Sequence, residues 1–268
     1  MLVVLLLTGD VVMAMDGPIR ELSSSEKAAV LGGSLGLAAL SRLLPDKISD
    51  STSYNSYRAN SLDRWWRARL HGDSGQHSNF LDNNAGALIA PTAALIALAC
   101  MDIDRHEFSR DIPFFVAGTV TTGALTVMCK RVIDRPRPYC QSSGTRPAGR
   151  PANDGYHTES FFSGHSSMAF FAAGFTNNRL RRHMRREWRR DEYRSWRWAS
   201  PLLTFGWATL VGGSRIHADK HHFTDVASGA LVGYGLSELF YRLCYQSGRT
   251  QSEESSGHSQ MFSVVIKF

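Results

Sequence analysis

Long hydrophobic runs recur along the chain and alternate with polar segments. Such runs are too long for typical strands, and few strand signals accompany them, so helices are the better interpretation. The six clearest runs cover residues 28–44, 85–101, 112–129, 166–178, 198–214 and 226–243. The pattern predicts an all-α fold, an up-down bundle of about six helices.

The lengths of the runs do not decide between a membrane-spanning bundle and a soluble one. A membrane-spanning helix needs about 20 apolar residues, and the uncharged runs here reach 17 or 18. They fit either short membrane spans or the buried helices of a soluble bundle. The polar segments at 45–84 and 139–160 are rich in Ser, Asn and Gly and are predicted to be loops.

The two ends of the chain differ from the helical part. Residues 1–14 resemble a signal peptide, but they lack a basic start and Asp10 interrupts the apolar stretch. A buried N-terminal apolar segment is the alternative. Residues 246–268 form a polar tail that ends in a short alternating, strand-like segment. We therefore expect a single helical domain over residues 23–245.

The positive charge is concentrated in one segment. The chain carries 30 Lys and Arg against 24 Asp and Glu, a net charge of +6. Residues 179–197 hold nine Arg and three acidic residues, also a net +6, so the remainder balances to zero. Arg interleaved with Trp on a helix is typical of binding to an anionic membrane surface. A solvated connector is the alternative, and nucleic acid is not an expected partner because no recognition module is present.

Candidate chemistry lies in three clusters at the ends of the predicted helices. The clusters are residues 130–138, 160–166 and 214–225. In an up-down bundle the end of one helix lies beside the start of the next. We therefore expect all three clusters at the same end of the bundle.

The residue types in these clusters suit a phosphate group. Permanent positive charge comes from Lys130, Arg137 and Arg215, and Arg binds phosphate bidentately. Ser163-Gly164-His165 opens a helix, where free backbone N–H groups and the helix dipole favour an anion. Gly164 permits close approach of the backbone to such a ligand.

Two histidines in separate clusters suggest nucleophilic catalysis. His165 and His221 could divide the roles of nucleophile and general acid. Asp225 follows His221 by four residues, so on a helix it lies on the same face and could hold the Nδ1–H of His221. A zinc site is the alternative, built from His217, His221, His222, Asp219 and Asp225. No Cys lies near that cluster and the adjacent cations would repel a divalent ion, so no metal is expected.

Together the clusters resemble the signature of the type 2 phosphatidic acid phosphatase (PAP2) and vanadium haloperoxidase superfamily. That signature reads Lys-x6-Arg-Pro, then Ser-Gly-His, then Ser-Arg-x5-His-x3-Asp. The matching residues are Lys130, Arg137, Pro138, Ser163, Gly164, His165, Ser214, Arg215, His221 and Asp225. Phe162 stands where many members have Pro. The amino-acid sequences of the last two clusters are similar to those of the lipid phosphate phosphatase branch.

The resemblance implies a PAP2/haloperoxidase-type core and a metal-independent phosphatase without a cofactor. His221 would attack phosphorus to form a phosphohistidine, Asp225 would orient His221, and His165 would protonate the leaving oxygen and then activate water. The implied phosphate-binding residues are Lys130, Arg137, Ser163, Gly164 and Arg215. The extra charges on Arg131, Arg135 and Lys220 are expected to lie on a solvated rim.

The expected substrate is a phosphomonoester or pyrophosphate of a lipid at the cell envelope. The chain would be membrane-associated or integral, with its site facing the periplasm or exterior. Three alternatives stay open. They are a soluble exported acid phosphatase of broad specificity for small phosphomonoesters, a haloperoxidase whose same residues hold vanadate, and a non-catalytic membrane-binding module. The intact set of charged site residues argues against the last.

Overall fold

The computed structural model describes residues 23–45, 57–71, 106–141 and 155–245, with isolated positions at 89, 93 and 96. Every element in these ranges is helical, as predicted. The α-helices are α2 (Ser24–Leu43), α4 (Ser61–Leu70), α6 (His106–Val132), α7 (Gly164–Glu187), α8 (Arg190–Trp196), α9 (Ala199–His217) and α10 (Phe223–Cys244). Two short 3₁₀ helices, η2 (Pro138–Gln141) and η3 (Gly155–Thr158), lie between α6 and α7.

The observed helices follow the hydrophobic runs, with two differences. The run at 166–178 is only the first part of α7, which continues to Glu187 because its Arg-rich second half has good helix propensity. The predicted loop at 45–84 contains α4. The run at 85–101 lies outside the described residues except at three isolated positions, and the predictions for 1–14 and 246–268 lie wholly outside them.

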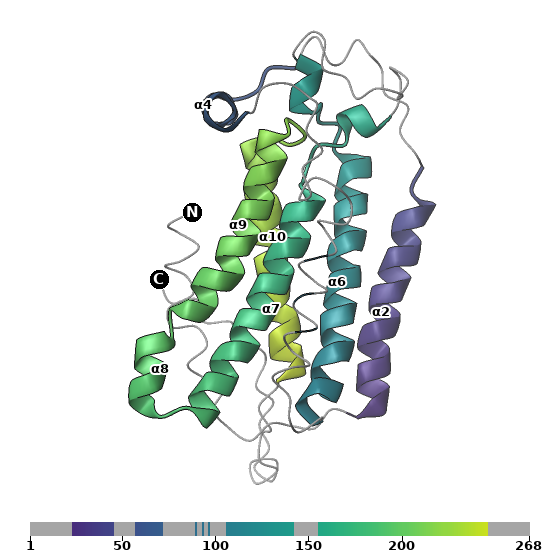
Figure 1. Ribbon diagram of the computed structural model, residues 1–268. Coiled ribbons are helices and arrows are strands. Elements are labelled where there is room, and N and C mark those ends of the chain that lie inside the picture. The colour runs from purple at the N-terminus through teal and green to yellow at the C-terminus, as the bar shows by residue number, and fades with distance from the viewer. Residues whose placement is uncertain are drawn as a thin grey trace, which may run out of the picture.

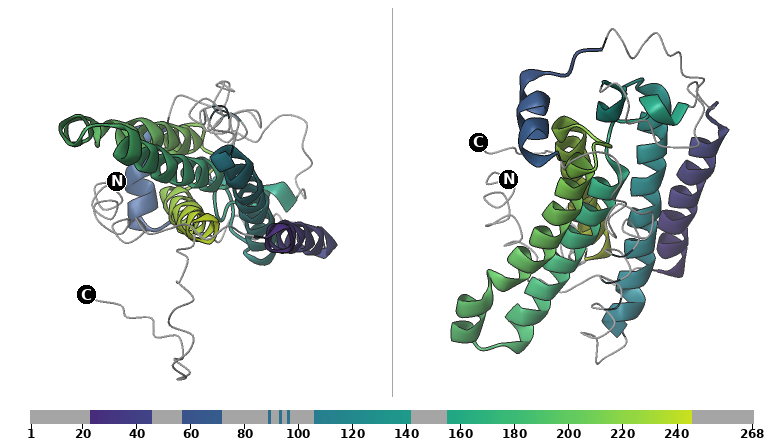
Figure 2. Two further views of the ribbon diagram at one scale, coloured as in Figure 1. Left: turned by 90° about the horizontal axis from the view of Figure 1, so that it is seen from below. Right: turned by 45° about the horizontal axis from the view of Figure 1, so that its top comes forward.

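Helix α7 is the centre of the bundle. It packs against α6, α9 and α10, whereas α2 lies at the periphery beside α6 (Figures 1 and 2). Between these helices lies a core in which aromatic rings are in edge-to-face or tilted contact. Its central side chains are Phe114, Phe115, Phe171, Phe175, Phe240 and Tyr241.

Two glycines bring α10 unusually close to α7. A Cβ at Gly229 would lie 2.6 Å from the carbonyl oxygen of Ser163, and one at Gly233 would overlap the carbonyl oxygen of Ser167. Only a residue without a side chain allows this approach. As a result, the first turns of α7 and α10 lie against each other.

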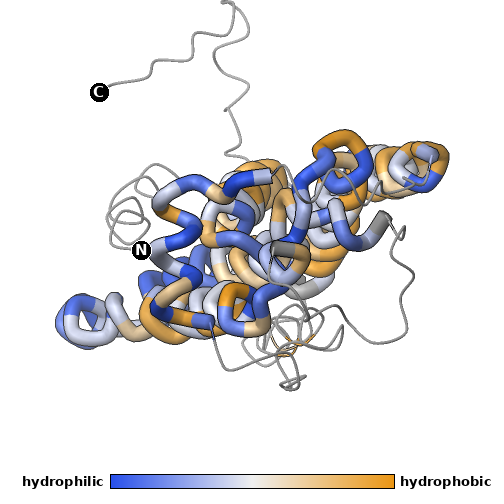
Figure 3. The backbone as a smooth tube through the Cα atoms, turned by 90° about the horizontal axis from the view of Figure 1, so that it is seen from above, coloured by the Kyte–Doolittle hydropathy of each residue, from blue (hydrophilic) through white to orange (hydrophobic). Residues whose placement is uncertain are grey.

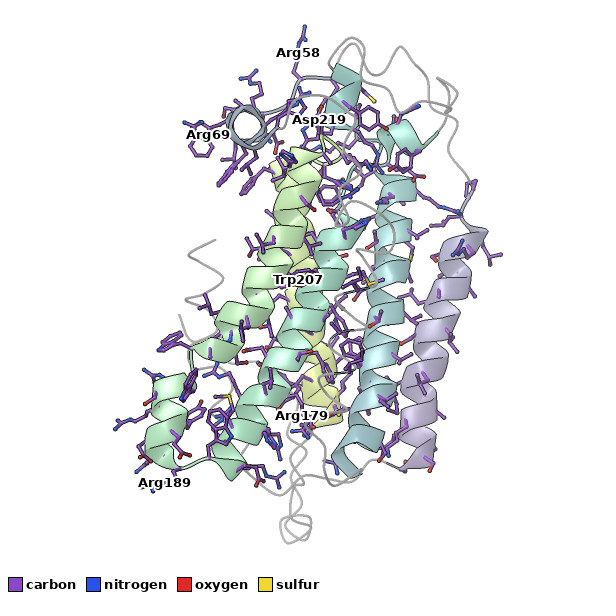
Figure 4. All side chains as sticks on the ribbon, in the orientation of Figure 1. Arg58, Arg69, Arg179, Arg189, Trp207 and Asp219 are labelled. Atoms are coloured by element: carbon purple, nitrogen blue, oxygen red, sulfur yellow. The ribbon has the colours of Figure 1, made fainter. Side chains whose placement is uncertain are left out.

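The ends of the helices bring the three sequence clusters together. Helices α6 and α9 end, and α7 and α10 begin, at the end of the bundle drawn at the top of Figure 1. We call this the site end. Asp219 lies there, while Arg179 and Arg189 lie at the opposite end (Figure 4).

The basic segment is divided between the core and the surface. Arg179 is 1% exposed, and its Nε donates to Asp111 at 2.7 Å. The hydroxyl of Tyr245 donates to the same carboxylate at 2.6 Å. Arg179 is therefore a core residue and not part of a membrane-facing surface, whereas every residue of α8 except the half-buried Tyr193 is exposed.

One helical stretch in the described part of the chain, Ser109–Val132, is long and apolar enough to cross a membrane. Core helices of soluble proteins pass the same test. Large hydrophobic side chains are nevertheless exposed on several other helices. They are Leu35, Leu40 and Leu43 on α2, Leu202, Leu203 and Leu210 on α9, and Leu231 and Leu239 on α10.

Candidate active site

The third cluster forms a tight turn between α9 and α10. The carbonyl oxygen of Arg215 accepts the backbone N–H groups of Lys220 and His221, at 3.1 and 3.3 Å. Asp219 has a φ of 55°, in the left-handed region that Asp tolerates better than most residues. Both carboxylate oxygens of Asp219 accept from the guanidinium of Arg67, at 2.6 and 2.5 Å. The turn is thereby fixed from outside by α4.

The hydrogen bonding of His221 defines which ring nitrogen is available for chemistry. His221 is buried, and its Nδ1 lies 2.7 Å from the carbonyl oxygen of Ser160. A carbonyl oxygen only accepts hydrogen bonds, so Nδ1 must carry the proton. In the neutral ring Nε2 then keeps its lone pair, which is the form that a nucleophile requires.

Asp225 is held by three donors from three segments. Its carboxylate accepts from the Ser160 hydroxyl at 2.6 Å, from the His222 backbone N–H at 2.9 Å and from the guanidinium of Arg135. It lies 3.8 Å from the Nδ1 of His221. The prediction that Asp225 itself takes the Nδ1–H is therefore wrong, because the Ser160 carbonyl takes it. Asp225 is instead a buried carboxylate that lies beside the His221 ring.

Burial and charge shift the pKa values of this pair in ways that suit nucleophilic attack. Burial raises the pKa of Asp225 to about 6, although Arg135 and the two other donors oppose the rise. Burial, together with the positive charges of Arg137, Lys130, Arg215 and His165, holds the pKa of His221 well below its usual value. His221 is therefore neutral at neutral pH, in agreement with its hydrogen bonding.

Arg137 organises the loops around the site. Its guanidinium donates to the carbonyl oxygens of Tyr156, Lys220 and Glu159, at 2.8, 3.0 and 3.1 Å. It also stacks on the Tyr156 ring at 3.8 Å. Three of its five N–H groups thus hold backbone segments in place, a task that the sequence did not predict, while its charge acts on His221.

The second cluster forms the start of α7. Ser163 is the N-cap and its hydroxyl accepts from the backbone N–H of Ser166 at 3.4 Å, while its own N–H donates to the Asp225 carbonyl oxygen at 3.1 Å. A Cβ at Gly164 would press against Thr126 of α6 at 3.0 Å. His165 follows in the first turn, so the helix N-terminus and His165 lie beside α10.

Comparison with known proteins identifies the family. The family model of the PAP2 superfamily matches residues 113–249, half of the chain. The chain belongs to the PAP2 superfamily. All eight predicted site residues fall inside the matched range, and the resemblance seen in the three sequence clusters is confirmed.

Curated relatives of this PAP2 chain include lipid phosphatases. A "Probable diacylglycerol pyrophosphate phosphatase 1" of Schizosaccharomyces pombe is 28% identical over 153 residues, which are 50% of this chain and 53% of that protein. "Phospholipid phosphatase 2" of Rattus norvegicus is 29% identical over 198 residues, 61% of this chain and 67% of that one. The chain thus spans about half to two thirds of the length of these relatives.

Among solved structures, a transmembrane PAP2-type phosphatidylglycerolphosphate phosphatase from Bacillus subtilis is similar to this chain. It shares 20% sequence identity, with a TM-score of 0.44. The alignment covers 80% of this chain and 94% of that one.

The PAP2 signature did not predict every residue that shapes the site. Arg135 was expected on a solvated rim, but its side chain is only 12% exposed and donates to Asp225, Asp63 and Tyr57. Asp63 comes from α4, outside the family match. A sequence signal for this helix exists, because Asn60 caps it and accepts the backbone N–H of Asp63 at 2.8 Å.

The zinc alternative is not supported by the geometry. The rings of His217, His221 and His222 contact three different carbonyl oxygens, those of Leu70, Ser160 and Pro136. Within the described ranges, no three His, Cys, Asp or Glu side chains are grouped to hold a metal ion.

Proposed function

We propose that this PAP2 protein is a phosphatase that hydrolyses a phosphomonoester or pyrophosphate of a lipid through a phosphohistidine on His221, without a metal or cofactor. The observation that carries the proposal is the hydrogen bond from His221 Nδ1 to the Ser160 carbonyl oxygen. It leaves Nε2 unprotonated, beside the cations Lys130, Arg137 and Arg215 that would attract a phosphoryl group.

The reaction would proceed in two displacements. In the first, Nε2 of His221 forms a bond to phosphorus while the bond to the leaving oxygen breaks, and His165 gives that oxygen a proton. In the second, His165 takes a proton from water, the water oxygen bonds to phosphorus, and the bond from phosphorus to Nε2 breaks. Asp225 stabilises the positive charge that His221 carries between the two steps.

Phosphate binding would fall to the basic side chains of the site and to the start of α7. Lys130, Arg137 and Arg215 would neutralise the phosphoryl oxygens. Ser163 and Gly164 open α7, so the N–H groups of its first turn would add donors for the same oxygens. These groups stabilise the charge that develops in the transition state.

A lipid substrate is supported by the names of the relatives and by the exposed apolar side chains of the bundle. The S. pombe relative is named as a diacylglycerol pyrophosphate phosphatase and the rat relative as a phospholipid phosphatase. Leu residues exposed along α2, α9 and α10 suit contact with lipid. We further propose that the protein acts at the cell envelope and that its site faces the periplasm or exterior.

The His221→Ala variant tests the proposal. We expect phosphate release from phosphatidic acid in detergent micelles to fall by roughly a thousandfold or more, and the acid-labile phosphoenzyme to disappear. His183→Ala, in the half of α7 far from the site, is the matched control and should keep both phosphate release and the phosphoenzyme. Turnover retained in His221→Ala would show that another residue is the nucleophile.

The same assay separates the alternative functions. Phosphate release is measured with four substrates, which are phosphatidic acid, diacylglycerol pyrophosphate, phosphatidylglycerophosphate and para-nitrophenyl phosphate. A preference for the soluble monoester would indicate a broad-specificity acid phosphatase. Vanadate-dependent bromide oxidation, without phosphate release, would indicate a haloperoxidase.

A further inference from the structure

A short helix from outside the family match contacts the catalytic carboxylate through one guanidinium. Arg135 donates through one terminal nitrogen to Asp225 and through the other to Asp63 of α4, the latter at 2.7 Å. Its Nε donates to the hydroxyl of Tyr57 at 2.9 Å. All three nitrogens of the fork are thus engaged, and both carboxylates are fully buried.

Asp63 also binds the helix that carries Asp225. One of its oxygens accepts the backbone N–H of Thr224 at 2.8 Å, and the other accepts the Thr224 hydroxyl at 3.0 Å. Thr224 precedes Asp225 in the first turn of α10. A carboxylate at a helix N-terminus is favourable for the dipole. Asp63 therefore fixes Asp225 by two routes, through Arg135 and through the backbone of α10.

We propose that Asp63 and Arg135 are positioning residues for the phosphoryl transfer. Helix α4 then contributes a residue to the active site. The proposal rests on the function proposed above. Arg135 holds Asp225 at a fixed distance from His221, and Asp63 holds Arg135. Because a guanidinium is a planar fork, it can bind both carboxylates in one geometry, which a lysine cannot do.

Anchoring of α4 does not depend on Asp63 alone. Arg67 binds Asp219 with two hydrogen bonds, and the Trp66 ring stacks on Phe223 at a centroid distance of 4.8 Å. The Leu70 carbonyl oxygen contacts His217 Nδ1 at 2.8 Å. The charge of Asp63 can therefore be removed while these contacts keep the helix in place, and Arg67→Gln is the matched control for anchoring.

Neutral substitutions of Asp63 and of Arg135 should move the acid limb of the pH profile of kcat, where activity falls as pH falls, in opposite directions. The negative charge of Asp63 raises the pKa of Asp225 and the positive charge of Arg135 lowers it. Asp63→Asn therefore lowers the pKa of Asp225, and Arg135→Gln raises it. The other groups around Asp225, unchanged in both variants, are Ser160, His221, His222 and Lys130.

The test measures kcat, KM and the pH dependence of kcat between pH 4 and 8 with phosphatidic acid in detergent micelles. Asp63→Asn and Arg135→Gln should each lower kcat by about tenfold and leave KM within about twofold. Relative to the wild type, the acid limb should move to lower pH in Asp63→Asn and to higher pH in Arg135→Gln. Arg67→Gln should leave the acid limb unmoved.

The outcomes separate this proposal from the one on which it rests. A wild-type chain without phosphate release would overturn the proposed function. An active wild type whose two variants keep its kcat, or shift the acid limb in the same direction, would overturn the positioning role alone. If Arg135→Gln does not fold, Arg135→Lys decides: with its charge kept and its fork lost, kcat should fall and the acid limb should stay near that of the wild type.

Discussion

Ser160 serves both members of the proposed catalytic pair with different atoms. Its carbonyl oxygen accepts from Nδ1 of His221 at 2.7 Å, and its hydroxyl donates to Asp225 at 2.6 Å. The first bond sets the tautomer of His221, and the second stabilises the ionised form of Asp225. Because one contact uses the backbone and the other the side chain, a substitution can remove the second without the first.

The Ser160→Ala variant removes the hydroxyl contact to Asp225 and keeps the carbonyl contact to His221. Losing the hydroxyl removes a donor to the charged form of Asp225, so the pKa of Asp225 should rise above its value of about 6. Activity that requires ionised Asp225 is lost as pH falls through this pKa, so the acid limb of kcat should move to higher pH. Phosphate release measured from pH 4 to 8 checks this, with Ser195→Ala on α8 as the control. A limb that stays in place or moves to lower pH would contradict the argument.

At the residue scale, the sequence predicted the charged groups of the site and not their supports. Lys130, Arg137, His165, Arg215 and His221 carry charges or ring nitrogens that suit phosphate chemistry, so residue type and spacing were enough to propose them. The supporting contacts depend on three-dimensional placement. A backbone carbonyl that fixes a tautomer, or a guanidinium shared by two buried carboxylates, leaves no pattern in a single sequence.

At the element scale, the position of the first turn of α7 depends on how closely α10 can approach it. Gly229 and Gly233 lie one turn apart on α10, against the carbonyl oxygens of Ser163 and Ser167. A side chain at either glycine would push the two helices apart. The proposed nucleophile and the proposed phosphate-binding turn would then separate as well, so the packing of the helices bears directly on the proposed chemistry.

Gly233→Ala measures this coupling. The added methyl group meets backbone that cannot give way, so we expect the free energy of unfolding to fall by about 1–3 kcal/mol. Gly235→Ala on the same helix has open space around its Cβ and should raise stability by about 0.4–1 kcal/mol, since Ala favours helix. Thermal unfolding in detergent micelles compares the two variants. Equal behaviour would show that α10 does not need the close approach.

Helices with long apolar runs were predicted from the sequence, whereas α4, whose main sequence signal is its Asn60 cap, was not. The runs at 112–129, 198–214 and 226–243 are apolar over many turns, so their length was enough to predict helices. The inward face of α4 carries Asp63 and Arg67 beside Trp66, and it is stabilised by ion pairs and one ring stack. A helix whose buried face is partly charged gives a weak hydrophobic signal. The polar residues on either side of α4 in the sequence led to the prediction of a loop.

At the scale of the whole molecule, the length of α6 and the exposed apolar side chains of the bundle suit contact with a bilayer. The apolar stretch Ser109–Val132 of α6 has 24 residues, which at 1.5 Å per residue is about 36 Å, enough to cross the roughly 30 Å of a hydrocarbon core. Viewed from the site end, hydrophobic turns reach the outer surface (Figure 3). Trp65 on α4, and Trp196 and Trp198 near α8, are exposed at opposite ends of the bundle, as in aromatic belts.

This geometry predicts that the two ends of the bundle lie on opposite sides of a membrane. The exposed Arg residues of α8 should lie on the cytoplasmic side by the positive-inside rule, which places the site end outside. Arg58→Cys at the site end should react with a membrane-impermeant maleimide on intact cells, whereas Ser195→Cys on α8 should react only after permeabilisation (Figure 4). The parent chain gives the background from native cysteines. The reverse pattern would place the site inside, and equal labelling of both variants would show that the bundle does not span the membrane.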